Sequence, residues 1–87
     1  DLLFQVMLEL GIPLSAKILK DDNIYYVDDG YLIACFKNID VNTLLKMAEK
    51  QPYYAVFRDS SFTNDSNPIN IKQIFNRFSP NTVRRIL

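Results

Sequence analysis

The chain has 87 residues, carries a formal net charge of +0 at pH 7, and is 48% hydrophobic and 23% charged. This composition is typical of an ordinary soluble globular domain, and the length allows one domain at most. The absence of histidine removes the commonest general base and metal ligand, so we expect no metal site. The single cysteine, Cys35, excludes an internal disulfide, and its apolar surroundings predict a buried, unreactive thiol of the kind found in the cytoplasm.

The first predicted element is a helix over residues 2–10. Asp1 suits the N-cap, Gly11 ends the helix and Pro13 prevents its continuation. The run is too short to span a bilayer. Seven of its nine residues are apolar, which is more than the stripe that a helix needs to pack on one sheet. We therefore expect the helix to contact another protein through an outward side that includes Leu3, Phe4 and Met7.

Three strand-like runs follow this helix, at residues 16–20, 23–28 and 31–37. Asp21-Asp22 separates the first two runs, and Asp29-Gly30 between the second and third is a strong hairpin signal. The runs therefore predict antiparallel strands. Residues 31–36 are continuously apolar, as expected for a strand that is buried on both faces.

Helices and strands alternate in the rest of the chain. We expect helices near 41–50 and 69–78, because the apolar residues of each recur at i, i+3, i+4 and i+7. Asp40 is the expected N-cap of the first helix, whereas Asn70 and Gln73 resemble a capping box in the second. Pro52 ends the first helix. The remaining runs predict strands at 53–58 and 82–87.

Together these elements predict an α/β fold with a small mixed sheet. It consists of an N-terminal helix, antiparallel hairpin strands and then a parallel βαβαβ unit, all within one domain over residues 1–87. Parallel pairing follows from right-handed crossovers. The periodicity places six side chains in the core: Leu32, Ala34, Leu45, Val56, Ile74 and Phe75.

Three segments of the chain resemble one protein family. They read Asp-Leu-Leu-Phe-Gln-Val-Met-Leu-Glu-Leu-Gly at 1–11, Tyr-Leu-Ile-Ala-Cys-Phe at 31–36 and Tyr-Tyr-Ala-Val-Phe-Arg-Asp-Ser-Ser-Phe at 53–62. They are similar to the C-terminal region of the modification (Mod) subunit of type III restriction-modification systems. The resemblance extends over nearly the whole chain, and its segments are family-typical rather than catalytic. It implies a parent that transfers a methyl group from S-adenosylmethionine to adenine N6 in DNA.

The resemblance also implies partners. Mod subunits pair with each other and with the restriction subunit, and the C-terminal region helps to hold that assembly. We therefore expect a non-catalytic C-terminal interaction domain, serving subunit assembly or packing against the parent methyltransferase domain. Since the chain begins at Asp1 rather than Met, we expect it to be a fragment. DNA is contacted through the parent.

The sequence lacks the motifs that the parent's chemistry needs. An S-adenosylmethionine site of this class uses a glycine-rich turn after a strand, whereas Gly11 and Gly30 are far apart. The segment Gln51-Pro52-Tyr53-Tyr54 lacks the first residue and the second proline of the Asn/Asp-Pro-Pro-Tyr motif that grips a flipped adenine. We therefore expect no catalytic residue and no bound cofactor in this chain. The resemblance implies that S-adenosylmethionine is bound by another part of the parent.

One polar constellation follows a predicted strand: Arg58, Asp59, Ser60 and Ser61. Ligands of open α/β sheets bind at the carboxyl ends of strands, and an arginine there can hold a phosphate or carboxylate with two parallel hydrogen bonds. The alternative is an internal tether, from Arg58 to Asp59 or to the backbone, that shapes the loop. A nucleophilic serine is excluded without a histidine or lysine base beside it. The constellation therefore supports one alternative function, a small α/β domain that binds a small ligand through Arg58 to Ser61.

Residues 66–87 carry four bases and no acid: Lys72, Arg77, Arg84 and Arg85. A basic end of this kind is typical of a module that contacts the phosphate backbone of DNA. The alternative is four solvated bases on a helix and a strand. The net charge of zero favours the alternative, because a nucleic-acid-binding surface normally makes the whole domain basic.

Overall fold

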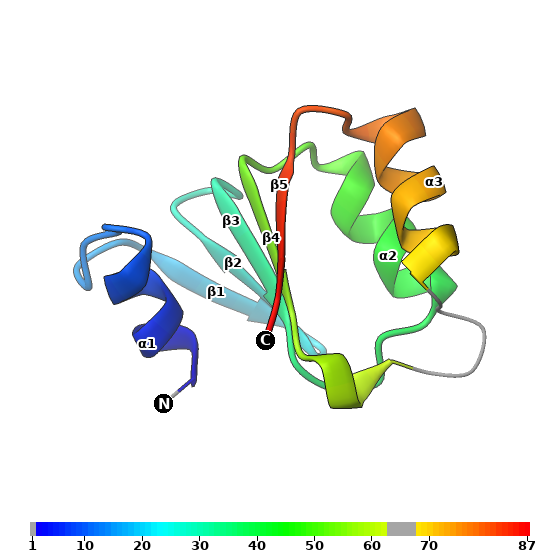
Figure 1. The fold of residues 1–87 in the computed structure, drawn as a ribbon. Coiled ribbons are helices and arrows are strands. Elements are labelled where there is room, and N and C mark those ends of the chain that lie inside the picture. Colours follow the sequence, from blue (N-terminus) through cyan, green and yellow to red (C-terminus); the bar gives the residue numbers. More distant parts are fainter. Residues whose placement is uncertain (1, 63–67) are drawn as a thin grey trace.

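The computed structural model describes residues 2–62 and 68–87. Its elements, in chain order, are α1 (Leu2–Glu9), β1 (Ile18–Asp21), β2 (Ile24–Val27), β3 (Leu32–Cys35), α2 (Val41–Glu49), β4 (Tyr54–Phe57), the 3-10 helix η1 (Asp59–Ser61), α3 (Pro68–Phe78) and β5 (Val83–Ile86). One sheet holds the five strands in the order β1-β2-β3-β4-β5 (Figure 1). Its first two pairings are antiparallel and its last two parallel. The predicted α/β fold with a small mixed sheet is confirmed.

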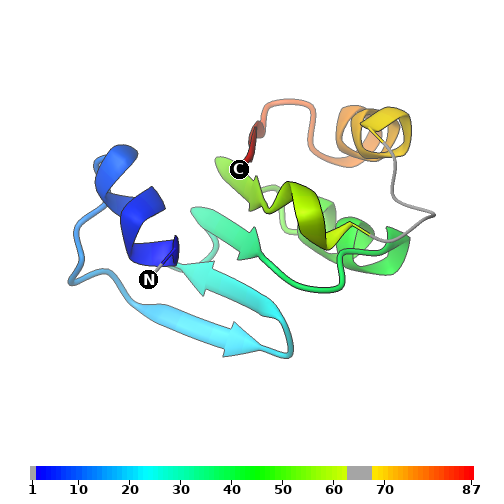
Figure 2. The same cartoon turned by 60° about the horizontal axis from the view of Figure 1, so that its bottom comes forward.

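The two faces of the sheet are covered by different helices. Both crossovers, β3–α2–β4 and β4–α3–β5, advance one strand in the same direction, and right-handed crossovers of this kind place their helices on the same face. Accordingly α2 packs against α3 (Figure 2), while α1 covers the opposite face (Figure 1). One core cluster therefore joins Ile33, Ala55 and Phe57 to α2 and α3, and a second joins Ala34 and Val56 to α1. Among the described residues no helix is long and apolar enough to cross a membrane.

Helix α1 ends at the predicted glycine. Gly11 has φ +74°, its N–H donates to the carbonyl of Leu8 at 3.2 Å, and the N–H of Ile12 donates to the carbonyl of Met7 at 2.8 Å. This pair of bonds is a Schellman motif, which satisfies carbonyls that the helix end would otherwise leave unpaired. Ile12 and Met7 are both buried, so the chain is also held by an apolar contact after the helix.

The orientation of α1 corrects the sequence-based assignment of its surfaces. Leu3 and Met7 were expected on the outward side, but they are 5% and 0% exposed and pack into the core with Val6. The outward apolar side chains are Phe4, as expected, and Leu8, at 44% and 64% exposure. The helical period sets which residues share a side, but it does not say which of two apolar sides meets the sheet.

The second hairpin has a longer loop than the Asp29-Gly30 signal predicts. The strands end at Val27 and restart at Leu32, because Asp28, Asp29 and Gly30 all have positive φ, at 54°, 57° and 94°. The N–H of Tyr31 donates to the carbonyl of Asp28 at 3.3 Å and closes the loop. Aspartate tolerates the left-handed region better than most residues, so the loop takes in Asp28 and Tyr31, both expected in strands.

The start of α2 agrees with the prediction from the sequence, whereas the start of α3 differs from it. Asp40 caps α2, its Oδ1 accepting a hydrogen bond from the backbone N–H of Thr43 at 2.8 Å. The capping box expected at Asn70 and Gln73 is wrong, because α3 already begins at Pro68 and Asn70 lies inside it. Proline suits the first turn of a helix, where its fixed φ fits and its missing N–H has no partner to lose.

The predicted core is largely confirmed. Leu32, Ala34, Val56 and Phe75 are buried, whereas Leu45 and Ile74 are only half-buried. Each of the two helices covers the sheet with one stripe, and these two residues lie at the side of that stripe. In α2 the buried stripe consists of Leu44, Met47 and Ala48.

Candidate functional site

The polar strand end predicted at Arg58 to Ser61 forms the turn that follows β4. Arg58 is exposed and extended, with φ −104° and ψ 125°, and η1 begins directly after it. The N–H of Asp59 donates to the carbonyl of Leu87 at 3.0 Å, which ties this turn to the end of β5. Ser60 is exposed, and the side chain of Ser61 lies outside the described residues. In the described part of the chain Arg58 and Asp59 do not form an ion pair, so no salt bridge between them shapes the turn.

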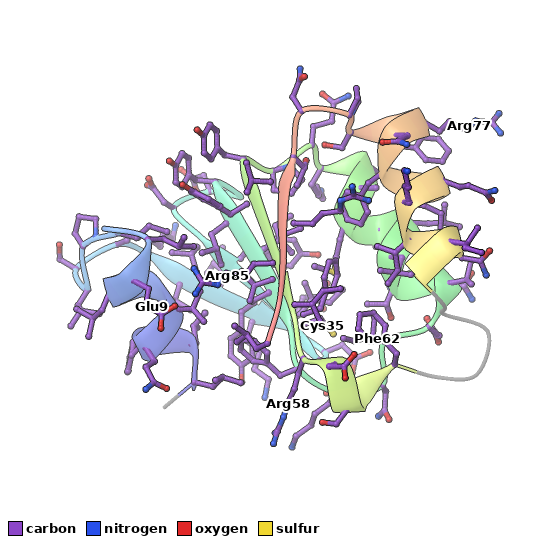
Figure 3. The ribbon with its side chains drawn as sticks, viewed as in Figure 1. Glu9, Cys35, Arg58, Phe62, Arg77 and Arg85 are labelled. Carbon is purple, nitrogen blue, oxygen red and sulfur yellow. The ribbon has the colours of Figure 1, made fainter. Side chains whose placement is uncertain are left out.

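Arg58 instead lines a pocket with residues from three other segments. The pocket lies at the carboxyl edge of β3 and β4, has a volume of about 180 Å³, and includes Lys20 of β1 and Lys37 after β3. Figure 3 shows Arg58 at this edge of the sheet. We call this site the basic pocket; its wall also contains Leu2, Asn23, Tyr25 and Phe36. Sequence reasoning missed the two lysines, because only the strand register brings them to Arg58.

The four bases of the C-terminal segment do not gather on one surface. Arg84 and Arg85 are consecutive in β5 and point to opposite faces, since Arg84 pairs with Ala55 and Arg85 with Val56 in the parallel register. The guanidinium carbon of Arg84 lies 6.0 Å from the centroid of the Phe75 ring, on the α3 side. Arg85 Nη2 donates to Glu9 Oε2 at 2.5 Å on the α1 side (Figure 3).

The other two bases, Lys72 and Arg77, are exposed on α3. The Arg77 guanidinium carbon lies 5.5 Å from the centroid of the ring of its neighbour Phe78. Figure 3 shows Arg77 far from Arg85. A duplex backbone is contacted by bases that share one side of a protein. Because Arg85 lies on the opposite face of the sheet from Arg84, the four bases together do not share one side.

The outward residues of α1 form a small apolar surface, which we call the α1 apolar surface. It consists of Phe4 and Leu8, one helical turn apart and both exposed. The next residue, Glu9, is held by its ion pair with Arg85, and the core side chains Leu3 and Met7 fix the opposite side of the helix. The surface is therefore carried by a helix that is anchored on two sides.

A second, larger hollow of about 410 Å³ lies at the amino edge of β4 and β5. Here the hydroxyls of Ser79 and Thr82 hydrogen-bond to each other, and Thr82 Oγ1 donates to the carbonyl of Pro52 at 2.6 Å. Both hydroxyl residues are buried. The segment Gln51-Pro52-Tyr53-Tyr54 thus contributes to the packing of two strand starts, and Tyr53 stacks on Tyr31 with ring centroids 5.2 Å apart.

The buried thiol and the glycines have structural roles. Cys35 is 0% exposed, burial raises the pKa of its thiol, and Sγ donates to the carbonyl of Lys37 at 3.3 Å. The prediction of a buried thiol is confirmed. Gly11 ends a helix and Gly30 joins two strands, so neither lies in the strand-to-helix turn of a nucleotide-type cofactor site. In the described residues no group of three or more histidine, cysteine, aspartate or glutamate side chains is arranged to hold a metal ion.

Comparison with protein-family models found no match, and none was found among curated proteins or solved structures.

Proposed function

We propose that the chain is a non-catalytic interaction domain from the C-terminal region of a type III modification subunit. In this role it packs against the parent methyltransferase domain or assembles with a second Mod subunit and the restriction subunit, in the cytoplasm. Methyl transfer from S-adenosylmethionine to adenine, and recognition of the DNA sequence, belong to other parts of the parent. The three family-typical segments at 1–11, 31–36 and 53–62 support this parent.

The α1 apolar surface is the observation that carries an interaction role. Phe4 and Leu8 are 44% and 64% exposed, although the same helix already fills its side of the core with other residues. Isolated exposed apolar residues are ordinary, but a pair on one stripe of an anchored helix forms a continuous surface. Contiguous apolar surface on a protein is typical of a site that another protein covers.

The proposal predicts that the chain associates with itself through this surface when its natural partner is absent. Phe4→Glu and Leu8→Glu place a charge on the surface and should each weaken association, because burying an unpaired carboxylate is unfavourable. Gln5→Glu is the matched control, since Gln5 is an exposed residue of the same helix. Sedimentation velocity over a concentration series measures the association, and circular dichroism checks that each variant remains folded.

Two results would contradict the proposal. A wild-type chain that sediments as a monomer at the highest concentration would show that the α1 apolar surface does not attract another protein. Equal weakening by Gln5→Glu would show that added charge, rather than the apolar surface, changed the association.

The parent is tested separately by sequencing the gene on either side of this segment. A modification subunit carries, upstream, a glycine-rich turn for S-adenosylmethionine and an Asn/Asp-Pro-Pro-Tyr motif for the flipped adenine. A gene that encodes neither motif would overturn the parent assignment without bearing on the behaviour of the α1 apolar surface.

A further inference from the structure

The basic pocket gathers three cationic side chains that lie far apart in the sequence. They are Lys20 in β1, Lys37 after β3 and Arg58 after β4. No aspartate or glutamate of the described residues lines this pocket. None of the three cations forms an ion pair with another described residue. The ion pair found among the described residues joins Glu9 and Arg85. Among the described residues, positive charge is therefore concentrated in the lining of this pocket, which contains no carboxylate.

The strand register places Lys20 on the same face of the sheet as Arg58, and Lys37 follows β3 at the same edge. Lys20 pairs with Tyr25, Tyr25 with Ala34, and Ala34 with Val56, so these residues point to the same face of the sheet. That face is the one covered by α1, because Ala34 and Val56 belong to its core cluster. Arg58 lies two residues beyond Val56 and returns to the same face at the edge of the sheet. The pocket is thus positioned by paired strands and the turn that follows them.

Two aromatic rings form one wall of the pocket. Tyr25 and Phe36 are half-buried, with ring centroids 6.1 Å apart. The Lys20 ammonium lies over the Tyr25 ring, 5.5 Å from its centroid, where the negative face of the ring attracts it. The wall holds this ammonium at the pocket and gives the pocket an apolar surface.

The size and charge of the pocket define the ligand. A volume of about 180 Å³ is below the range of about 300–1,000 Å³ that holds a drug-sized molecule. It therefore suits one compact group, with any remainder of the ligand in solvent. An arginine guanidinium binds phosphate through two parallel hydrogen bonds, and lysine ammonium groups add point charges to the same oxygens. A phosphate group presents three acceptor oxygens, one for each of the three cations, whereas a carboxylate presents two.

We propose that the basic pocket binds a phosphate group through Lys20, Lys37 and Arg58. The phosphate is either free or part of a nucleic-acid strand whose sugars and bases lie outside the pocket. This site is separate from the α1 apolar surface, and its ligand does not depend on the parent assignment.

The test uses two probes, inorganic phosphate and a single-stranded oligodeoxynucleotide, each titrated into the whole chain at fixed ionic strength. Binding is followed through the backbone amide NMR signals of residues 37 and 58. Arg58→Gln should weaken binding about tenfold or more, which is the usual effect of losing a hydrogen bond to a charged group. Arg58→Lys keeps the positive charge but loses the paired N–H donors of the guanidinium, and it should weaken binding less than Arg58→Gln does. Arg77→Gln is the matched control, because Arg77 is also an exposed arginine and lies on α3, away from the pocket.

Each outcome decides for or against the pocket. Saturation by inorganic phosphate that is lost in Arg58→Gln and kept in Arg77→Gln supports a free phosphate ligand. The same pattern with the oligonucleotide alone supports a phosphate of a nucleic-acid strand. Absence of saturation by either probe overturns the proposal, as does equal weakening by Arg77→Gln, which would reflect general charge attraction. Both arginines are exposed, so these variants should keep the wild-type amide spectrum away from the site.

Discussion

The two faces of the sheet differ in how completely they are covered. Among the described residues, the face under α2 and α3 contains a cluster of eleven buried residues, while the face under α1 contains eight. The central strands β3 and β4 serve both clusters, because their side chains alternate between the faces. Strand β5 is exposed along its length, on both faces of the sheet. We call the α2–α3 side, which has two helices and the larger core, the closed face, and the α1 side, which has one helix, the partly open face.

Both candidate functional features lie on the partly open face. Phe4 and Leu8 project from α1, and the basic pocket lies beside the start of the same helix, where Leu2 lines it. Lys72, Arg77, Arg84 and Arg85, which the sequence offered as possible contacts to a DNA backbone, are instead divided between the two faces. The difference teaches that in this fold the stability is concentrated under the helix pair, which leaves the single-helix face available for contacts with other molecules.

The largest expected effect tests the closed face. Phe75 is 1% exposed, and its ring packs edge-on against Phe57 with centroids 5.9 Å apart. Phe75→Ala should cost about 3–5 kcal/mol of the free energy of unfolding, measured by chemical denaturation. Since small domains have about 5–15 kcal/mol in total, much of the stability would be lost.

The partly buried Phe78 on the same helix is the control for Phe75. Phe78→Ala should cost clearly less, because less apolar surface is withdrawn from water at that position. Equal losses for the two variants would contradict the view that the α2–α3 face is the closely packed one.

A smaller effect concerns the start of α2. Asp40→Ala should cost about 0.5–2 kcal/mol at neutral pH, because the cap to the Thr43 N–H is lost. That hydrogen bond lowers the pKa of Asp40 below its usual value. The folded pKa is therefore below the unfolded one, so the contribution is complete above the unfolded pKa and is lost as the pH falls through the folded pKa.

Denaturation of wild type and Asp40→Ala at a series of pH values measures this dependence. The difference between the two proteins should shrink in acid as Asp40 is protonated in the folded state, because a neutral carboxyl accepts the Thr43 N–H less strongly than a carboxylate does. Asn42→Ala, at an exposed position of the same helix, should show no such pH dependence. A difference that persists unchanged in strong acid would contradict the capping role.

The smallest effect tests the open face. Glu9 and Arg85 are 49% and 42% exposed, and their ion pair links the first helix to the last strand. A double-mutant cycle with Glu9→Gln and Arg85→Gln should give a coupling energy of about 0.2–1 kcal/mol that declines with added salt. A coupling that is insensitive to salt would show that this face is closed in solution and that α1 packs more deeply than the structure indicates.

Local patterns in the sequence were sufficient for most elements. Gly11 ends α1 and Asp40 starts α2, because both signals act through the backbone of their own helix. The mixed sheet was also predictable, since short turns give antiparallel pairs and helical crossovers give parallel ones. The expected start of α3 was wrong because the side-chain pattern at Asn70 competed with a stronger local signal, Pro68.

The candidate site was decided by tertiary structure. The sequence singled out Arg58, but Lys20 and Lys37 join it only through pairings between strands that are distant along the chain. It also indicated that α1 has more apolar surface than one sheet requires, without showing that Leu8 rather than Met7 faces outward. A helix with apolar residues on several sides can be rotated in many ways at similar local energy, and packing against β2 and β3 selects one of them.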